Sequence, residues 1–134
     1  MTAILHRQLV RQFYDVMWNQ WNVETGRRIL TMDVEFDGSM GVSTEGLADF
    51  FGYMDLVRRA FPDFRSHLET LVADNGGASA RLLCTGTHQG DLPGLPATGR
   101  EISYAGAAFF QFRQMRICKV WVLGDREALF EQLS

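Results

Sequence analysis

A single carboxylate follows an apolar run near the end of the sequence. Residues 119–125 read Lys-Val-Trp-Val-Leu-Gly-Asp. If this run is a strand, Asp125 lies on the same face as Trp121, because side chains two and four residues apart share a face. An apolar wall such as an indole raises the pKa of a nearby carboxyl group. Asp125 in a dry pocket could therefore act first as a general base and then as a general acid.

The same aspartate is also well placed to begin a helix. Residues 125–130 read Asp-Arg-Glu-Ala-Leu-Phe, and Asp is a favoured N-cap residue that contributes about 1 kcal/mol. A capping carboxylate accepts backbone N–H groups, which lowers its pKa and makes it a poor base at neutral pH. The residue pattern alone favours the cap for Asp125 over the pocket acid.

Two histidines fall on strand-like segments. His88 continues the small apolar alternation of residues 80, 82, 84 and 86, so we expect it on an inner face near a sheet end. There it could bond to the following loop, which the pattern favours, or bind a substrate carbonyl and serve as a second catalytic group. His67 alternates with Arg65 and Glu69 on a more polar face, and is a second candidate for a pocket role.

The sequence is rich in large rings, with ten Phe, three Tyr and three Trp. Such rings can fill a core or line a cavity that binds a flat aromatic molecule. The candidate pocket walls are Tyr14, Trp18, Phe36, Tyr53, Tyr104 and Trp121. Core packing is the alternative for each of them.

Apolar spacing predicts three helices in the first half of the chain. Residues 3–20 carry apolar side chains four apart, which is typical of an amphipathic helix. Asn22 could cap a short second helix. A third helix is predicted from residue 47, after a loop at 39–46, and should end before Pro62. Between the second and third helices, residues 33–38 alternate as a strand does.

The second half changes to the period of strands. We predict strands over 65–73, 79–88, 101–112 and 117–123, followed by a short helix over 126–133. The Asp-Asn-Gly-Gly run at 74–77 predicts a hairpin turn. Residues 89–100 contain three Gly and two Pro and predict a loop. Helices followed by a meander of strands indicate one α+β domain spanning 1–134, with helices packed on a strongly curved antiparallel sheet that forms an open cone.

Composition excludes several classes of protein. The formal net charge of −3 over 134 residues argues against nucleic-acid binding. No apolar run reaches the roughly 18 residues of a membrane span, and no signal peptide is evident, so we expect a cytoplasmic protein. Cys84 and Cys118 lie in apolar strands without metal-ligand spacing, so no metal site is expected.

Several short motifs occur in an order that resembles one family. They are residues 60–63 (Ala-Phe-Pro-Asp), 71–73 (Leu-Val-Ala), 86–90 (Gly-Thr-His-Gln-Gly), 94–100 (Gly-Leu-Pro-Ala-Thr-Gly-Arg) and 115–125. Together they resemble the SnoaL-like polyketide cyclases of the cone-shaped NTF2-like superfamily. Phe-Asp-Gly-Ser-Met-Gly, Tyr-Ala-Gly-Ala-Ala-Phe-Phe and Trp-Val-Leu-Gly-Asp resemble a branch that includes polyketide hydroxylases.

The resemblance implies an enzyme of secondary metabolism that works without a cofactor on a polycyclic, polyketide-like small molecule. The reaction would be an aldol-type cyclisation or a hydroxylation-type tailoring step, with Asp125 as the acid/base. It also implies a homodimer formed through the outer face of the sheet. The cyclases place a histidine beside that aspartate, whereas this sequence has no histidine after residue 88. This difference favours the alternative, a non-catalytic small-molecule-binding or scaffold protein.

Overall fold

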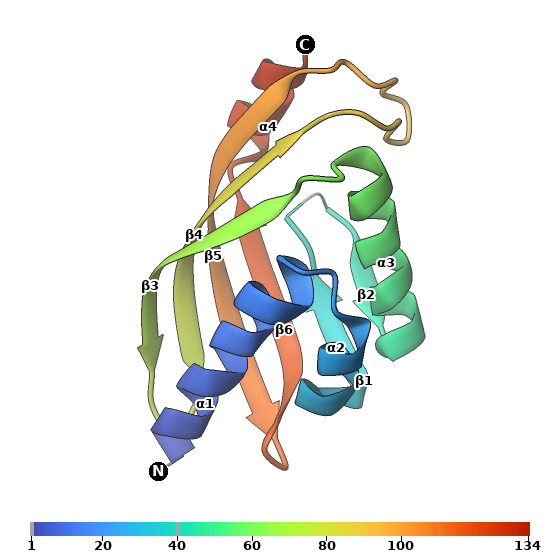
Figure 1. The fold of residues 1–134 in the computed structure, drawn as a ribbon. Coiled ribbons are helices and arrows are strands. Elements are labelled where there is room, and N and C mark those ends of the chain that lie inside the picture. The colour runs from blue at the N-terminus through green and yellow to red at the C-terminus, as the bar shows by residue number, and fades with distance from the viewer. Residues whose placement is uncertain (1, 40) are drawn as a thin grey trace.

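The computed structural model describes residues 2–39 and 41–134. The fold is α+β, as predicted. One curved six-stranded sheet carries the N-terminal helices on its concave face, and a short helix follows the last strand (Figure 1). The two chain ends lie at opposite ends of the molecule (Figure 1). Met40, in the predicted 39–46 loop, is outside the described residues.

The first predicted helix is divided into two helical types. An α-helix, α1 (Thr2–Arg11), runs directly into a π-helix, η1 (Gln12–Trp18). Four side chains of η1 are buried, at positions 13, 14, 17 and 18. The apolar side chains predicted to form one face of this helix therefore pack against the sheet and α3 rather than facing solvent.

The other helices begin and end where local signals predicted. Helix α2 (Val23–Ile29) is capped by Asn22, whose side chain accepts a hydrogen bond from the Thr25 N–H at 3.0 Å. Helix α3 (Leu47–Ala60) ends before Pro62, since the residue before a proline avoids helical angles. Helix α4 (Arg126–Leu133) closes the chain.

The strands are β1 (Leu30–Asp37), β2 (Ser43–Glu45), β3 (Arg65–Ala73), β4 (Ala78–Thr87), β5 (Glu101–Arg113) and β6 (Arg116–Gly124). Their order across the sheet is β2-β1-β6-β5-β4-β3. The strands β3 to β6 form the predicted antiparallel meander, whereas β1 pairs in parallel with β6. The sheet is thus mixed, and the short strand β2 lies within the segment predicted as a loop.

Tight turns hold the meander together. In the turn at 74–77 the Asp74 carboxylate accepts hydrogen bonds from the N–H groups of Gly76 and Gly77, at 2.8 and 2.9 Å. The turn between β5 and β6 places Gln114 and Met115 at φ of 52° and 63°. These left-handed values match the twist of a two-residue hairpin, although neither residue is glycine.

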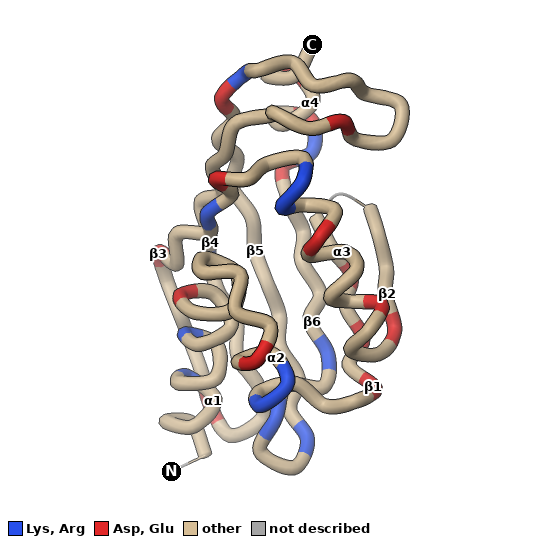
Figure 2. Tube along the Cα trace, turned by 45° about the vertical axis from the view of Figure 1, so that its right-hand side comes forward, with Lys and Arg blue, Asp and Glu red and all other residues tan. Residues whose placement is uncertain are grey.

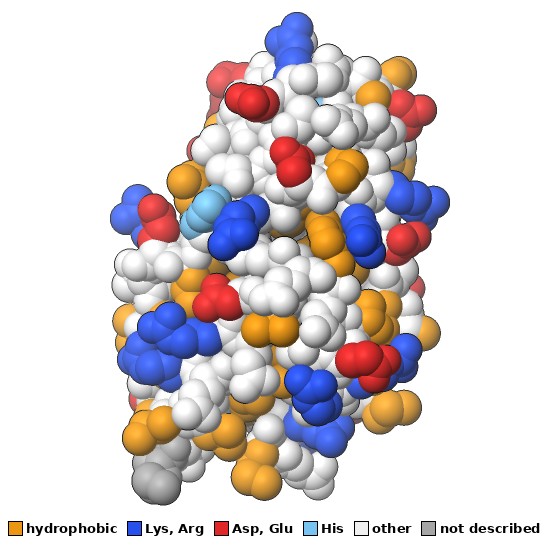
Figure 3. All heavy atoms as spheres, in the orientation of Figure 1, with side chains coloured by type: hydrophobic (Ala, Val, Ile, Leu, Met, Phe, Trp, Pro, Cys, Tyr) orange, Lys and Arg blue, Asp and Glu red, His pale blue; other side chains and the backbone are white. Residues whose placement is uncertain are grey.

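Charged residues are distributed over all layers of the fold and are not concentrated on one element (Figure 2). On the helix-covered face, charged and polar side chains surround smaller hydrophobic areas (Figure 3). No helix in the described part of the chain is long and apolar enough to cross a membrane.

Candidate functional site

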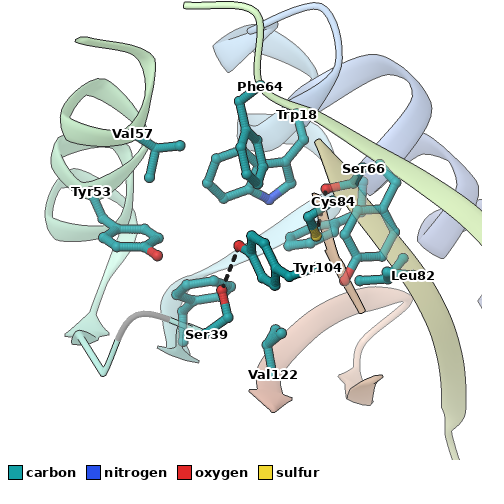
Figure 4. Close-up of a pocket in the computed structure, with 13 residues that line it drawn as sticks. Trp18, Ser39, Tyr53, Val57, Phe64, Ser66, Leu82, Cys84, Tyr104 and Val122 are labelled. Carbon is teal, nitrogen blue, oxygen red and sulfur yellow. Dashed lines mark hydrogen bonds between the residues drawn. The ribbon is translucent and has the colours of Figure 1, made fainter. Parts of the chain in front are cut away.

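The concave side of the sheet and the helices above it enclose an apolar cavity (Figure 4). The cavity itself measures only about 30 Å³, or about 390 Å³ when the spaces between side chains and the open mouth are included. The interior therefore forms a narrow space between side chains. Thirteen residues line it: Phe13, Tyr14, Trp18, Phe36, Ser39, Tyr53, Val57, Phe64, Ser66, Leu82, Cys84, Tyr104 and Val122.

The π-helix η1 supplies Phe13, Tyr14 and Trp18 to this lining. π-Helical turns are rare and occur frequently at functional sites. The Trp18 ring lies edge-on to Phe50 and Tyr53, with ring centroids 5.9 and 6.2 Å apart. These contacts hold the aromatic wall in place from α3.

Gly124 is the last residue of β6, at a position where there is no room for a side chain. A Cβ atom at this position would lie 2.6 Å from the Cβ of Ser39 and 3.2 Å from the Tyr104 ring. The glycine therefore lets the loop after β1 approach β5. Across this gap the hydroxyls of Ser39 and Tyr104 share a hydrogen bond of 3.1 Å (Figure 4).

The three tyrosines of the sequence, Tyr14, Tyr53 and Tyr104, all line this one cavity. Burial raises the pKa of each phenol above its usual value, and the nearby Cys84 adds to this effect. Burial also raises the pKa of the Cys84 thiol to about 11, an effect only partly offset by hydrogen bonding to Ser66 and Tyr104. At neutral pH the polar groups of the cavity are therefore uncharged hydrogen-bond donors and acceptors.

Asp125 is outside the cavity and caps α4. Its Oδ1 accepts a hydrogen bond from the Ala128 N–H at 3.0 Å, and the residue is exposed. This geometry contradicts a pocket acid and matches the alternative that the residue pattern favoured.

The indole expected beside Asp125 is also outside the cavity. Trp121 lies on the outer face of the sheet, whereas Asp125 follows the end of β6 at Gly124. Trp121 is 43% exposed and packs on Phe109, its partner on β5, with ring centroids 5.8 Å apart. The inward positions of β6 are held by Val120 and Val122, which makes the predicted pocket role of Trp121 wrong.

The histidines are not among the cavity walls either. His88 is fully buried under the 89–100 loop, where its Nδ1 accepts the Thr98 N–H at 3.2 Å and its ring lies 5.3 Å from that of Phe61. This is the structural role that the sequence pattern favoured. His67 is on the outer face, 3.2 Å from the Thr85 hydroxyl, so its predicted pocket position is wrong.

The five other predicted wall residues, Tyr14, Trp18, Phe36, Tyr53 and Tyr104, are brought together around the cavity. Sequence reasoning missed Ser39, Ser66 and Cys84. Cys84 was recognised as inward-facing, but only as a hydrophobe. Ser66 is opposite Cys84 in the β3–β4 pairing, with Oγ and Sγ 3.9 Å apart, and only that register reveals it.

The lining determines what chemistry the cavity can support. It contains no carboxylate and no imidazole among the described residues. Its hydroxyls can polarise a carbonyl group and stabilise an oxyanion, as preorganised donors do in other enzymes. A proton could move only between these hydroxyl groups and the Cys84 thiol, or within the ligand itself.

Comparison with known proteins agrees with this geometry. A SnoaL-like polyketide cyclase from Agrobacterium tumefaciens is 26% identical, with a TM-score of 0.76, and the match covers 93% of this chain and 95% of that one. A protein from a Jannaschia species has a TM-score of 0.90 at 15% identity, with 99% and 94% covered. AclR from Streptomyces galilaeus, for which a hydroxylase role has been suggested, has a TM-score of 0.81 at 21% identity, with 98% and 85% covered. Among curated protein sequences no significant match was found.

A curved sheet whose concave face is closed by helices around an apolar cavity defines the NTF2-like class of proteins. The family model for the SnoaL-like polyketide cyclases matches residues 8–133. The chain therefore belongs to the SnoaL-like polyketide cyclase family, as its sequence motifs predicted.

Proposed function

We propose that this protein binds a flat, polyketide-like aromatic molecule in the tyrosine-lined cavity and promotes its ring closure. The observation that carries the proposal is the convergence of Tyr14, Tyr53 and Tyr104 on one narrow space walled by aromatic rings. Rings provide stacking surfaces for a flat ligand. Neutral phenols provide donors for its carbonyl oxygens.

An aldol closure through an enol requires no strong base. β-Dicarbonyl groups enolise in water, and the enol carbon then attacks a second carbonyl carbon. The new C–C bond forms as the electrons of that C=O bond move to its oxygen. This oxygen takes up a proton, while the enol oxygen releases one and becomes a carbonyl. The paired hydroxyls of Tyr104 and Ser39, 3.1 Å apart, form a relay that can pass this single proton.

The test is the rate of closure of a synthetic aryl β-diketone, followed by chromatography. We expect the protein to exceed the rate in buffer, and Tyr104→Phe to reduce the excess by about 10²-fold, as the loss of one oxyanion donor does elsewhere. Trp121→Phe, on the outer face, is the matched control and should keep the full rate. Equal rates for Tyr104→Phe and the unmodified protein would contradict the proposed chemistry.

A second function is favoured by one specific observation, the position of Asp125. Since the carboxylate caps α4, the cavity has no group with an acidic pKa among its described walls. The protein would then be a non-catalytic small-molecule-binding or scaffold protein. Binding of aromatic ketones without any acceleration of closure would identify this alternative.

We also propose that two copies pair through the outer face of the sheet. Phe109, Trp121 and Leu123 are 50, 43 and 60% exposed there and form a continuous apolar area across β5 and β6. Surfaces of this kind mark interaction sites. Light scattering should give a dimer mass, and Trp121→Lys should give a monomer mass. A monomer mass for the unmodified protein would contradict the pairing.

A further inference from the structure

The hydroxyls of two cavity tyrosines differ in their hydrogen bonding. The Tyr104 hydroxyl bonds to Ser39. The Tyr14 hydroxyl is fully buried and has no hydrogen-bond partner among the residues that the structure describes. Tyr14 as a whole is 3% exposed. A buried donor without a partner is unusual in a native protein and calls for a specific explanation.

The Tyr14 ring is held firmly. It meets the rings of Phe13 and Phe110 edge-on, with centroids 4.9 and 5.9 Å apart. Both neighbours are buried core residues. The phenol therefore cannot easily turn away to find solvent, and its ring stays in the wall of the cavity that Tyr14 lines.

The surroundings define the group that could satisfy this hydroxyl. All thirteen described lining residues are uncharged at neutral pH. A carboxylate or phenolate entering this space would lose its hydration without meeting a cation, which is strongly unfavourable. An uncharged acceptor such as a ketone or quinone oxygen would be satisfied by the phenol without that penalty.

We propose that Tyr14 is the specificity-determining donor of the cavity, which selects ligands with an uncharged carbonyl oxygen and rejects anionic ones. This inference rests on the proposed function, that the cavity binds aromatic molecules, and adds the chemical class of the ligand. On this inference the Tyr14 hydroxyl gains its hydrogen-bond partner only when a ligand is bound. The hydroxyl should then contribute to binding but not to the stability of the ligand-free protein.

The chain offers a matched control for the prediction that the Tyr14 hydroxyl does not stabilise the ligand-free protein. Thr44, on β2, also has a buried hydroxyl with no partner among the described residues, and it lies outside the cavity lining. Thr44→Val removes this hydroxyl with little change in shape, as Tyr14→Phe does at position 14. Both variants should keep or raise Tm, because each removes a buried unsatisfied group. Only Tyr14→Phe should change ligand choice.

The experiment compares three one-ring ligands, chosen because the interior is narrow: acetophenone, ethylbenzene and benzoate. Dissociation constants come from ligand-detected NMR with the unmodified protein, Tyr14→Phe and Thr44→Val. We expect benzoate to bind at least tenfold more weakly than acetophenone. In Tyr14→Phe the preference for acetophenone over ethylbenzene should fall by about tenfold, whereas in Thr44→Val it should not change.

Each other outcome has a distinct meaning. An unchanged preference in Tyr14→Phe, or benzoate bound as tightly as acetophenone, would overturn the inference while leaving an aromatic binding site intact. A lower Tm for ligand-free Tyr14→Phe alone would also overturn it, since the hydroxyl would then have a partner already. If none of the three ligands binds to the unmodified protein, the proposed function itself fails.

Discussion

Replacing Asp125 by alanine distinguishes a helix-capping role of this residue from a catalytic one. The substitution removes the 3.0 Å hydrogen bond between the carboxylate and the Ala128 N–H. Loss of an N-cap residue costs about 1 kcal/mol. Helix α4 is also fastened to β5 through Gln132, whose side chain makes two 2.8 Å hydrogen bonds to the Ser103 backbone. We therefore expect no larger loss, and a decrease in Tm of about 3–5 °C.

Asp125→Asn is the matched variant, because asparagine caps a helix nearly as well as aspartate. Its Tm should stay within about 1 °C of the original, apart from a small loss of charge interaction with the helix dipole. Ligand binding and turnover should be unchanged in both variants, since the side chain is outside the cavity. Thermal melts and the β-diketone assay give the two measurements. An Asp125→Asn protein with normal Tm and a hundredfold loss of turnover would refute the assignment as a cap.

Two further predictions concern the cavity. Gly124→Ala brings a methyl group to 2.6 Å from the Ser39 Cβ, so the loop that carries Ser39 must move. We expect a lower Tm and at least tenfold weaker binding of acetophenone. Equal binding would contradict the close approach of Ser39 to Gly124. Burial raises the pKa of the Cys84 thiol to about 11, so this thiol is protonated at pH 8. Iodoacetamide should therefore label the partly exposed Cys118 first, and Cys84, located by mass spectrometry, should be labelled only slowly at pH 8. Fast labelling of Cys84 at pH 8 would contradict its burial.

Local signals in the sequence predicted the elements well. These signals include Asn22, Pro62 and the Asp-Asn-Gly-Gly turn. Each affects only the backbone of its neighbours in the sequence, so its effect can be predicted without knowledge of the rest of the chain. The parallel pairing of β1 with β6 joins segments about 85 residues apart. Nothing local to either strand specifies such a pairing, and the meander pattern of the later strands gave no indication of it.

The error at Trp121 has a similar origin. Alternation places Trp121 and Leu123 on one face of β6, but both faces of this strand are apolar. Val120 and Val122 are as hydrophobic as Trp121 and Leu123, so the period of two cannot say which pair is inside. The register with β5, which sets Val120 opposite the buried Phe110, makes that choice.

The cavity walls were predicted in part because large rings are easy to recognise. Tyr14, Trp18, Phe36, Tyr53 and Tyr104 were identified from residue type and spacing. Small polar residues such as Ser39 gave no signal, because a serine in a loop is typical of any turn. Its role depends on the contact with Tyr104 that the missing side chain at Gly124 permits.

The gathering of all three tyrosines in one place has a spectroscopic consequence. The phenols of this cavity are the whole tyrosine chromophore of the chain, and their raised pKa values keep them protonated while the cavity stays closed. In an alkaline titration the ultraviolet absorbance of tyrosinate should therefore not rise gradually, as it does for phenols in water. The appearance of tyrosinate absorbance would therefore report when the cavity opens, without any added label.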